Sequence, residues 1–175
     1  MMKRVEGARI YLRELAESDL DRTWEWLHRP DINDKIGVET PFTKQQQKEW
    51  FANLQEDGAK VVFAVCLRSD DTHVGNVSLD MIDRRHRNAR FSIFIADESM
   101  RGLGLGSESI RLLEEYAFST LGLHKIWCKT DAGSAEVTRF YEKLGFSQEG
   151  VLCQHELKGA RYVDKILFGK LEPNR

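Results

Sequence analysis

The chain has 175 residues, of which 41% are hydrophobic, 10% aromatic and 31% charged; this composition is typical of soluble globular proteins and excludes disordered and fibrous classes. The length fits one domain of ordinary size, so we predict a single domain over residues 1–175. The 26 basic and 28 acidic residues give a net charge of −2, which supplies no general attraction to nucleic acid or to an anionic membrane.

The first half of the chain predicts one strand, two helices and a meander of three strands. Alternating apolar residues indicate a strand over 9–15, and Pro30 is expected to end the helix that follows. Thr43 and Gln46 have the spacing of a capping box, which predicts a second helix ending before Gly58. The three strands of the meander are expected over 61–67, 73–82 and 89–96, joined as antiparallel hairpins.

The second half alternates helices with strands. Strand–helix–strand passages imply parallel pairing there, because a parallel connection needs a crossover. We therefore expect an α/β (α+β) fold with a mixed central sheet of about seven strands flanked by about four helices. The expected helices cover 106–121 and 134–144, ended by Gly122 and Gly145, and the expected strands cover 125–130, 146–152 and 162–168.

The cellular location is predicted from what the sequence lacks. Its longest apolar run is far shorter than the ~20 residues of a membrane-spanning helix. The basic N-terminus is followed by no apolar segment of the kind found in secretory signals. We therefore expect a cytoplasmic protein with no membrane or nucleic-acid partner.

The cysteines and histidines predict neither a disulfide framework nor a metal site. Cys66, Cys128 and Cys153 are odd in number, and the first two lie in apolar segments, so free thiols are expected. His124 with Cys128, and Cys153 with His155, lack the spacing of zinc ligands. No metal is therefore expected.

A glycine-rich stretch, RGLGLGSES at 101–109, lies between a predicted strand and a predicted helix. Glycines spaced by two before a helix let consecutive N–H groups point into one concavity, where the helix dipole favours an anion. These are the properties of a phosphate-binding loop. The spacing matches neither the triphosphate P-loop nor the dinucleotide GxGxxG pattern, and a glycine-rich turn that binds nothing stays open as an alternative.

The pattern Arg101-x-x-Gly104-x-Gly106 resembles the pyrophosphate-binding loop of the GNAT acetyltransferases. Three further segments, RIYLRELAESDL, FYEKLGFSQEG and RYVDKILFGKLE, resemble the branch that includes ribosomal-protein N-terminal, spermidine and amino-sugar acetyltransferases. The similarity spans nearly the whole chain, and the motifs occur in family order. It implies the GNAT fold and an N-acetyltransferase that uses acetyl-CoA and no metal.

The resemblance places the cofactor against two segments. The diphosphate is expected against main-chain N–H groups of the glycine loop, and the thioester arm along the preceding strand, where a backbone N–H would polarise the carbonyl. Ser134 stands where the family commonly has an Asn that contacts the cofactor arm, and it is also a candidate N-cap. The implied cofactor-binding residues are Ile93, Phe94, Ile95, Arg101, Gly102, Leu103, Gly104, Leu105, Gly106, Ser107 and Ser134.

Tyr141 matches the family's tyrosine in the penultimate helix, which implies a general acid that protonates the departing CoA thiolate. On spacing alone it is a packing residue. Where many members have a Glu that orients or deprotonates the amine, this chain has Arg90, and a cation there would repel an ammonium. Asp80 and Glu39 are weighed as bases without an assignment, and Cys128 as an acyl-carrying nucleophile is disfavoured because no activating base is evident.

The acceptor is predicted only as a class. The arginines of DRRHRNAR (Arg84, Arg85, Arg87 and Arg90) either form a solvated hairpin loop or contact anionic groups of the substrate or the 3′-phosphate of CoA. We expect transfer within a ternary complex to a primary amine of a small molecule, with an amino sugar or nucleotide-linked amino sugar ahead of a protein N-terminus. A non-catalytic acyl-CoA-binding module is the alternative class, and a homodimer stays open.

Overall fold

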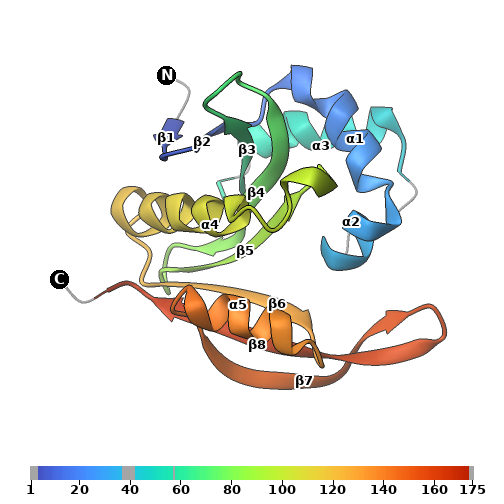
Figure 1. Ribbon diagram of the computed structural model, residues 1–175, viewed down its shortest axis with the longest axis vertical. Coiled ribbons are helices and arrows are strands. Elements are labelled where there is room, and N and C mark those ends of the chain that lie inside the picture. The colour runs from blue at the N-terminus through green and yellow to red at the C-terminus, as the bar shows by residue number, and fades with distance from the viewer. Residues whose placement is uncertain (1–3, 37–41, 57, 174–175) are drawn as a thin grey trace.

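The computed structural model describes residues 4–36, 42–56 and 58–173 (Figure 1). Eight strands form one sheet in the order β1-β2-β3-β4-β5-β6-β8-β7, and all neighbours are antiparallel except β5 and β6. The predicted mixed sheet is confirmed, with β1 as a strand that its short polar sequence did not reveal. The strands are β1 (Arg4–Glu6), β2 (Ile10–Glu14), β3 (Val61–Leu67), β4 (His73–Asp83), β5 (Asn88–Ile95), β6 (Lys125–Asp131), β7 (Ser147–Lys158) and β8 (Arg161–Leu171).

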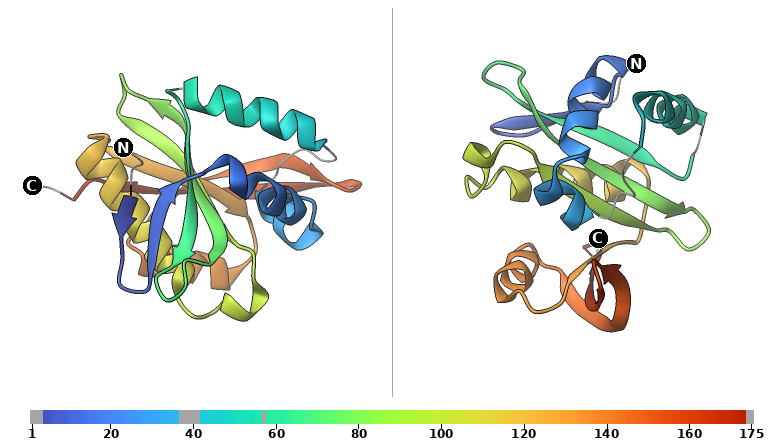
Figure 2. Two further views of the ribbon diagram at one scale, coloured as in Figure 1. Left: turned by 90° about the horizontal axis from the view of Figure 1, so that it is seen from above. Right: turned by 90° about the vertical axis from the view of Figure 1, so that its right-hand side faces the viewer.

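Helices cover both faces of the sheet (Figures 1 and 2). The side chains of β3 point alternately to the two faces of the sheet. Phe63 and Val65 belong to the main core with α4, whereas Ala64 and Cys66 pack with side chains of α3 on the other face. The first face carries α4 (Leu105–Glu115), its π-helical continuation (Tyr116–Thr120) and α5 (Ala135–Lys143). The second face carries α1 (Leu20–Leu27), α2 (Pro30–Ile36) and α3 (Lys44–Glu56).

The helix boundaries confirm two predicted caps and the predicted end of the first helix, and they add one helix. Thr43 N–H donates to Gln46 Oε1 at 2.8 Å and Gln46 N–H donates to Thr43 Oγ1 at 3.1 Å, as in a capping box. Ser134 Oγ accepts from the Val137 N–H at 3.3 Å and caps α5. α1 ends at Leu27, before Pro30, as predicted. Pro30 itself begins α2, a further helix that was not predicted, where a missing N–H breaks no hydrogen bond.

Three further observations concern the described residues. All three cysteines are free thiols. No helix in the described part of the chain is long and apolar enough to cross a membrane. Nowhere in residues 4–36, 42–56 and 58–173 do three or more His, Cys, Asp or Glu side chains come together in a group that could hold a metal ion.

The sheet opens in its middle, between β5 and β6. These strands pair only at Asn88 with Lys125, Ala89 with Ile126 and Arg90 with Trp127, and then separate (Figure 1). β5 continues to pair with β4 as far as Ile95. One edge of β5 is therefore without a partner strand beyond Arg90, and this opening positions the candidate site.

Candidate active site

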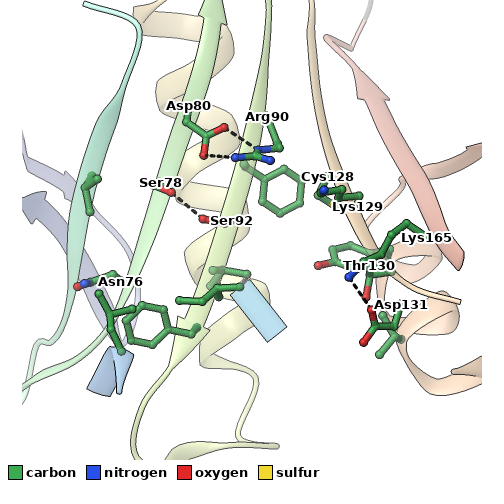
Figure 3. Close-up of a pocket in the computed structure, with 18 of the residues that line it drawn as sticks. Asn76, Ser78, Asp80, Arg90, Ser92, Cys128, Lys129, Thr130, Asp131 and Lys165 are labelled. Carbon is green, nitrogen blue, oxygen red and sulfur yellow. Dashed lines mark hydrogen bonds and ion pairs between the residues drawn. The ribbon is translucent and has the colours of Figure 1, made fainter. Parts of the chain in front are cut away.

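A cavity of about 570 Å³ occupies the opening between β5 and β6 (Figure 3). Its walls come from β4 and β5 on one side, β6 and β8 on the other, and α5 on the first face of the sheet; residues of α1, α2 and α3 border it on the second face. Two ligands can therefore approach from opposite faces and meet between the strands. Lining residues include Thr23, Asn76, Ser78, Asp80, Arg90, Ser92, Phe94, Cys128, Asp131, Ser134, Tyr141 and Lys165.

The free edge of β5 presents backbone donors to this cavity. The Ala96 N–H donates to the Val74 carbonyl of β4 at 2.8 Å. Because backbone groups alternate along a strand, the N–H groups of Ile93 and Ile95 point away from β4, toward the opening. Phe94 turns its N–H toward β4, and its side chain lines the cavity. The three predicted strand residues thus come together here, with Ile93 and Ile95 supplying the outward N–H groups.

The glycine loop leads into an uncapped helix N-terminus. Gly102 and Gly104 have φ of +76° and +81°, which glycine adopts without steric cost. Gly104 is the N-cap of α4 and makes no side-chain cap, and its carbonyl accepts from the Glu108 N–H at 3.1 Å. The N–H groups of residues 105–107 precede that bond and have no intrahelical acceptor. Together with the helix dipole they favour an anion at this point.

The acidic side chain in the first turn of α4 is turned away from that anion site. Glu108 Oε1 accepts from the Arg9 backbone N–H and Oε2 pairs with Arg9 Nε, both at 2.8 Å. Burial alone would raise the pKa of Glu108, but these hydrogen bonds from Arg9 hold that pKa below its usual range. Arg9 also donates to the Leu103 carbonyl at 2.6 Å. Its cation therefore stands beside the loop, a placement that sequence analysis missed because 94 positions separate Arg9 from Leu103.

The Arg101 side chain leaves the loop and contacts α2. Its Nη2 pairs with Asp31 Oδ2 at 2.6 Å, and its Nε donates to the Ile95 carbonyl at 3.1 Å. Arg29 pairs with Asp31 at 2.9 Å and donates to the Ala96 carbonyl at 2.9 Å. Bonds from Arg29 and then Arg101 lower the pKa of Asp31 to about 2. Arg101 thus offers its backbone to the loop, while its side chain fixes the loop against α2.

Tyr141 lies in the cavity wall within a cluster of aromatic rings. Its ring stacks on Phe168 at 5.1 Å and meets Phe140 edge-on at 5.2 Å between centroids. Burial, with the Cys128 thiol beside it, raises the pKa of Tyr141 well above its usual range, so the phenol stays protonated and can donate. Burial also raises the pKa of Cys128 to about 12. The thiol is therefore protonated, which argues against a nucleophilic role.

Arg90 forms an ion pair inside the cavity. Its Nε donates to Asp80 Oδ1 at 2.7 Å and its Nη2 to Asp80 Oδ2 at 3.1 Å (Figure 3). The two residues are register partners on adjacent strands. Asp80 therefore balances the charge that was expected to repel an ammonium at this position. Both oxygens of Asp80 are occupied by Arg90, so Asp80 is not assigned as the base, and Glu39 lies outside the described residues.

The other arginines of the cluster lie at the far end of β5. Their loop precedes this strand and the glycine loop follows it, so seven residue steps of ~3.3 Å place the two loops about 23 Å apart. Arg87 donates to the Gly122 carbonyl at 2.7 Å. Of the four arginines, only Arg90 lines the cavity. The geometry does not bring Arg84, Arg85 or Arg87 to the predicted phosphate site.

The comparisons with known proteins agree with this geometry. A family model described as the acetyltransferase (GNAT) domain matches residues 9–147. The probable N-acetyltransferase YjcK of Bacillus subtilis is 30% identical and covers 97% of this chain and 98% of its own length. Spermidine N(1)-acetyltransferase of Escherichia coli is 34% identical, with 90% of this chain and 83% of the relative covered.

A solved structure extends the comparison to three dimensions. The crystal structure of spermidine N-acetyltransferase from Vibrio cholerae in complex with CoA and spermine has a TM-score of 0.88 to this chain at 26% identity. The match covers 94% of this chain and 96% of that chain. The two proteins therefore share a fold over nearly their full lengths.

Proposed function

Because this chain belongs to the GNAT acetyltransferase family and is an acetyl-CoA-dependent N-acetyltransferase, we propose that it acetylates a primary amine of a small molecule by direct attack in a ternary complex. The observation that carries the proposal is the cavity open to both faces of the sheet. Polar side chains of β4 and β5 line this cavity, and the glycine loop with the N-terminus of α4 follows the C-terminal end of β5 in the chain. Since the relatives are named as N-acetyltransferases, the alternative hypothesis of a non-catalytic acyl-CoA-binding module is not retained.

The residues present fit acetyl-CoA, which supplies an activated thioester when it is bound. The N–H groups of residues 105–107 hold the diphosphate, and the Arg9 guanidinium, which is paired with Glu108, fixes the loop through the Leu103 carbonyl. The outward N–H of Ile93 polarises the thioester carbonyl. Tyr141 lies in the cavity wall with its phenol protonated, because burial raises its pKa, and it donates its proton to the departing thiolate.

The acceptor amine approaches from the second face of the sheet. Asn76, Ser78 and Ser92 offer hydrogen bonds there, and the Arg90–Asp80 pair adds no net charge. An ammonium of pKa near 10 must lose its proton before it can attack. No side chain of the described residues is assigned to remove it, so the amine is taken to enter in its neutral form.

The comparisons bear on which small amine is acetylated. The two relatives compared above with a named substrate act on spermidine. Their names support an alkyl amine and give no support to the amino sugar expected from the sequence. A protein N-terminus remains the second acceptor class, and the homodimer remains a prediction.

The proposed function is tested by acetyl-CoA-dependent thiol release with alkyl amines, spermidine, amino sugars and peptides with a free N-terminus. Rapid turnover of one small-amine class supports the proposal. Turnover of peptides alone contradicts the small-molecule acceptor. Mass spectrometry of the product, with an increase of one acetyl group on nitrogen, distinguishes transfer from hydrolysis of the thioester.

The pH dependence should reflect the amine and not Tyr141. We expect kcat/KM to rise about tenfold per pH unit below the amine's pKa and then to level off, because only the neutral amine attacks. Burial raises the pKa of Tyr141 far above its usual range, so the acid stays protonated and no falling limb should appear up to about pH 10. A fall near pH 9 in a still-folded protein would assign a different acid.

A further inference from the structure

A second cavity lies beside the first, on the face of the sheet opposite α5. Its volume is about 540 Å³. Arg90 and Lys129 line both cavities, so the two are neighbours and share a wall. A ligand that occupies both cavities has to pass beside these two side chains.

The floor of the second cavity is apolar. Trp127 of β6 lies on it, together with Leu152 of β7 and Leu167 of β8, and all three are half-buried. Met81 at its edge is 59% exposed. Exposed apolar surface rimmed by polar groups is characteristic of a binding site, and an indole ring is well suited to pack against another ring.

The charged groups at the rim are paired. Arg90 pairs with Asp80, Lys125 with Glu149 at 2.6 Å, and Lys129 with Glu156 at 2.7 Å. Glu156 is also bound by Lys165 at 2.5 Å. Lysine or arginine side chains of the protein thus already neutralise these carboxylates. The ammonium groups of a linear polycation would have to displace those side chains in order to pair with them. An uncharged group needs no such exchange.

The register gives the distance between the two cavities. Trp127 pairs with Arg90, three residues before Ile93 on the same strand, so the floor lies about 10 Å from the proposed thioester position at ~3.3 Å per residue. We propose that the second cavity binds an apolar ring of the acceptor, about 10 Å from the reacting nitrogen. This inference rests on the proposed function and narrows its substrate to a long-chain arylalkylamine, in preference to a linear polyamine.

The test compares amines that differ only in the ring or its distance. The probes are benzylamine, hexylamine, 6-phenylhexylamine and spermidine, each with acetyl-CoA. Wild-type kcat/KM should be at least tenfold higher for 6-phenylhexylamine than for hexylamine. Trp127→Ala should lower kcat/KM for 6-phenylhexylamine about tenfold by raising KM. The kcat/KM values for hexylamine and benzylamine should not change.

Two further variants keep the test independent of folding. Met81→Asp places a charge on the exposed edge of the floor and should weaken only the 6-phenylhexylamine reaction. Tyr162→Ala removes an aromatic ring that is 63% exposed on β8 and lines neither cavity, and it should change nothing. Equal kcat/KM for hexylamine and 6-phenylhexylamine, or a preference for spermidine, would overturn the inference while leaving the proposed function intact. Absence of turnover with every amine would instead remove the proposed function.

Discussion

Gly106→Asp should abolish acetyl-CoA binding and leave the protein at least as stable as the wild type. Gly106 lies in the first turn of α4 with ordinary backbone angles, and a Cβ there would meet nothing within 4 Å. A side chain in place of glycine stabilises a helix by about 0.5–1 kcal/mol, and an acid near the N-terminus adds about 0.3–1 kcal/mol. The same carboxylate repels a diphosphate, which weakens binding by about 3 kcal/mol or more and raises the Kd more than about 100-fold.

The two effects are measured separately. Isothermal titration with acetyl-CoA gives the loss of affinity, and thermal unfolding should show a Tm about 2–8 °C above the wild-type value. Gly106→Asn has nearly the same shape without the charge and should bind much better than the Asp variant. If both variants bind acetyl-CoA like the wild type, the N-terminus of α4 does not hold the diphosphate.

Tyr141→Phe should lower kcat about 100-fold while the Kd for acetyl-CoA stays within about twofold. The variant keeps the ring that stacks on Phe168 and meets Phe140, so packing of α5 is preserved. It loses only the hydroxyl proposed to protonate the thiolate. The measurement is single-turnover acetyl transfer beside direct binding of acetyl-CoA.

A matched control removes a different buried hydroxyl. Tyr11 of β2 is 4% exposed and lines neither cavity. Its hydroxyl donates to Asp71 at 2.8 Å. Tyr11→Phe should therefore cost stability and leave kcat unchanged. Wild-type kcat in the Tyr141 variant would end the general-acid assignment, and equal losses in both variants would point to a general effect of removing a hydroxyl.

Most strands and helices were predictable because their signals are local. The strand over 61–67 has the predicted bounds, and the glycine after the long helix has φ of +63°, as a helix-ending glycine often does. Pro30 was correctly expected to end the first helix, and α2 was missed because proline is also favoured at the first position of a new helix. β1 was missed because its three residues are too few for an alternating pattern.

The site was less predictable because its geometry depends on pairing between distant strands. The loss of pairing after Arg90 could not be predicted, because it depends on how two strands that are distant in the sequence lie relative to one another. The Arg90–Asp80 pair could have been found, because a hairpin between 73–82 and 89–96 places the two residues on neighbouring strands. The pairing of Arg9 with Glu108 had no local signal at all.

The short pairing of β5 with β6 also bears on solubility. A strand with unsatisfied backbone groups can pair with strands of other molecules, and long exposed sheet edges promote aggregation. Here the open edge of β5 lies inside the sheet, between two walls of side chains, where a whole polypeptide strand with its neighbours cannot dock. A slender ligand that carries its own amide groups can still enter. The fold thereby keeps a reactive backbone edge available to its cofactor while shielding it from self-association.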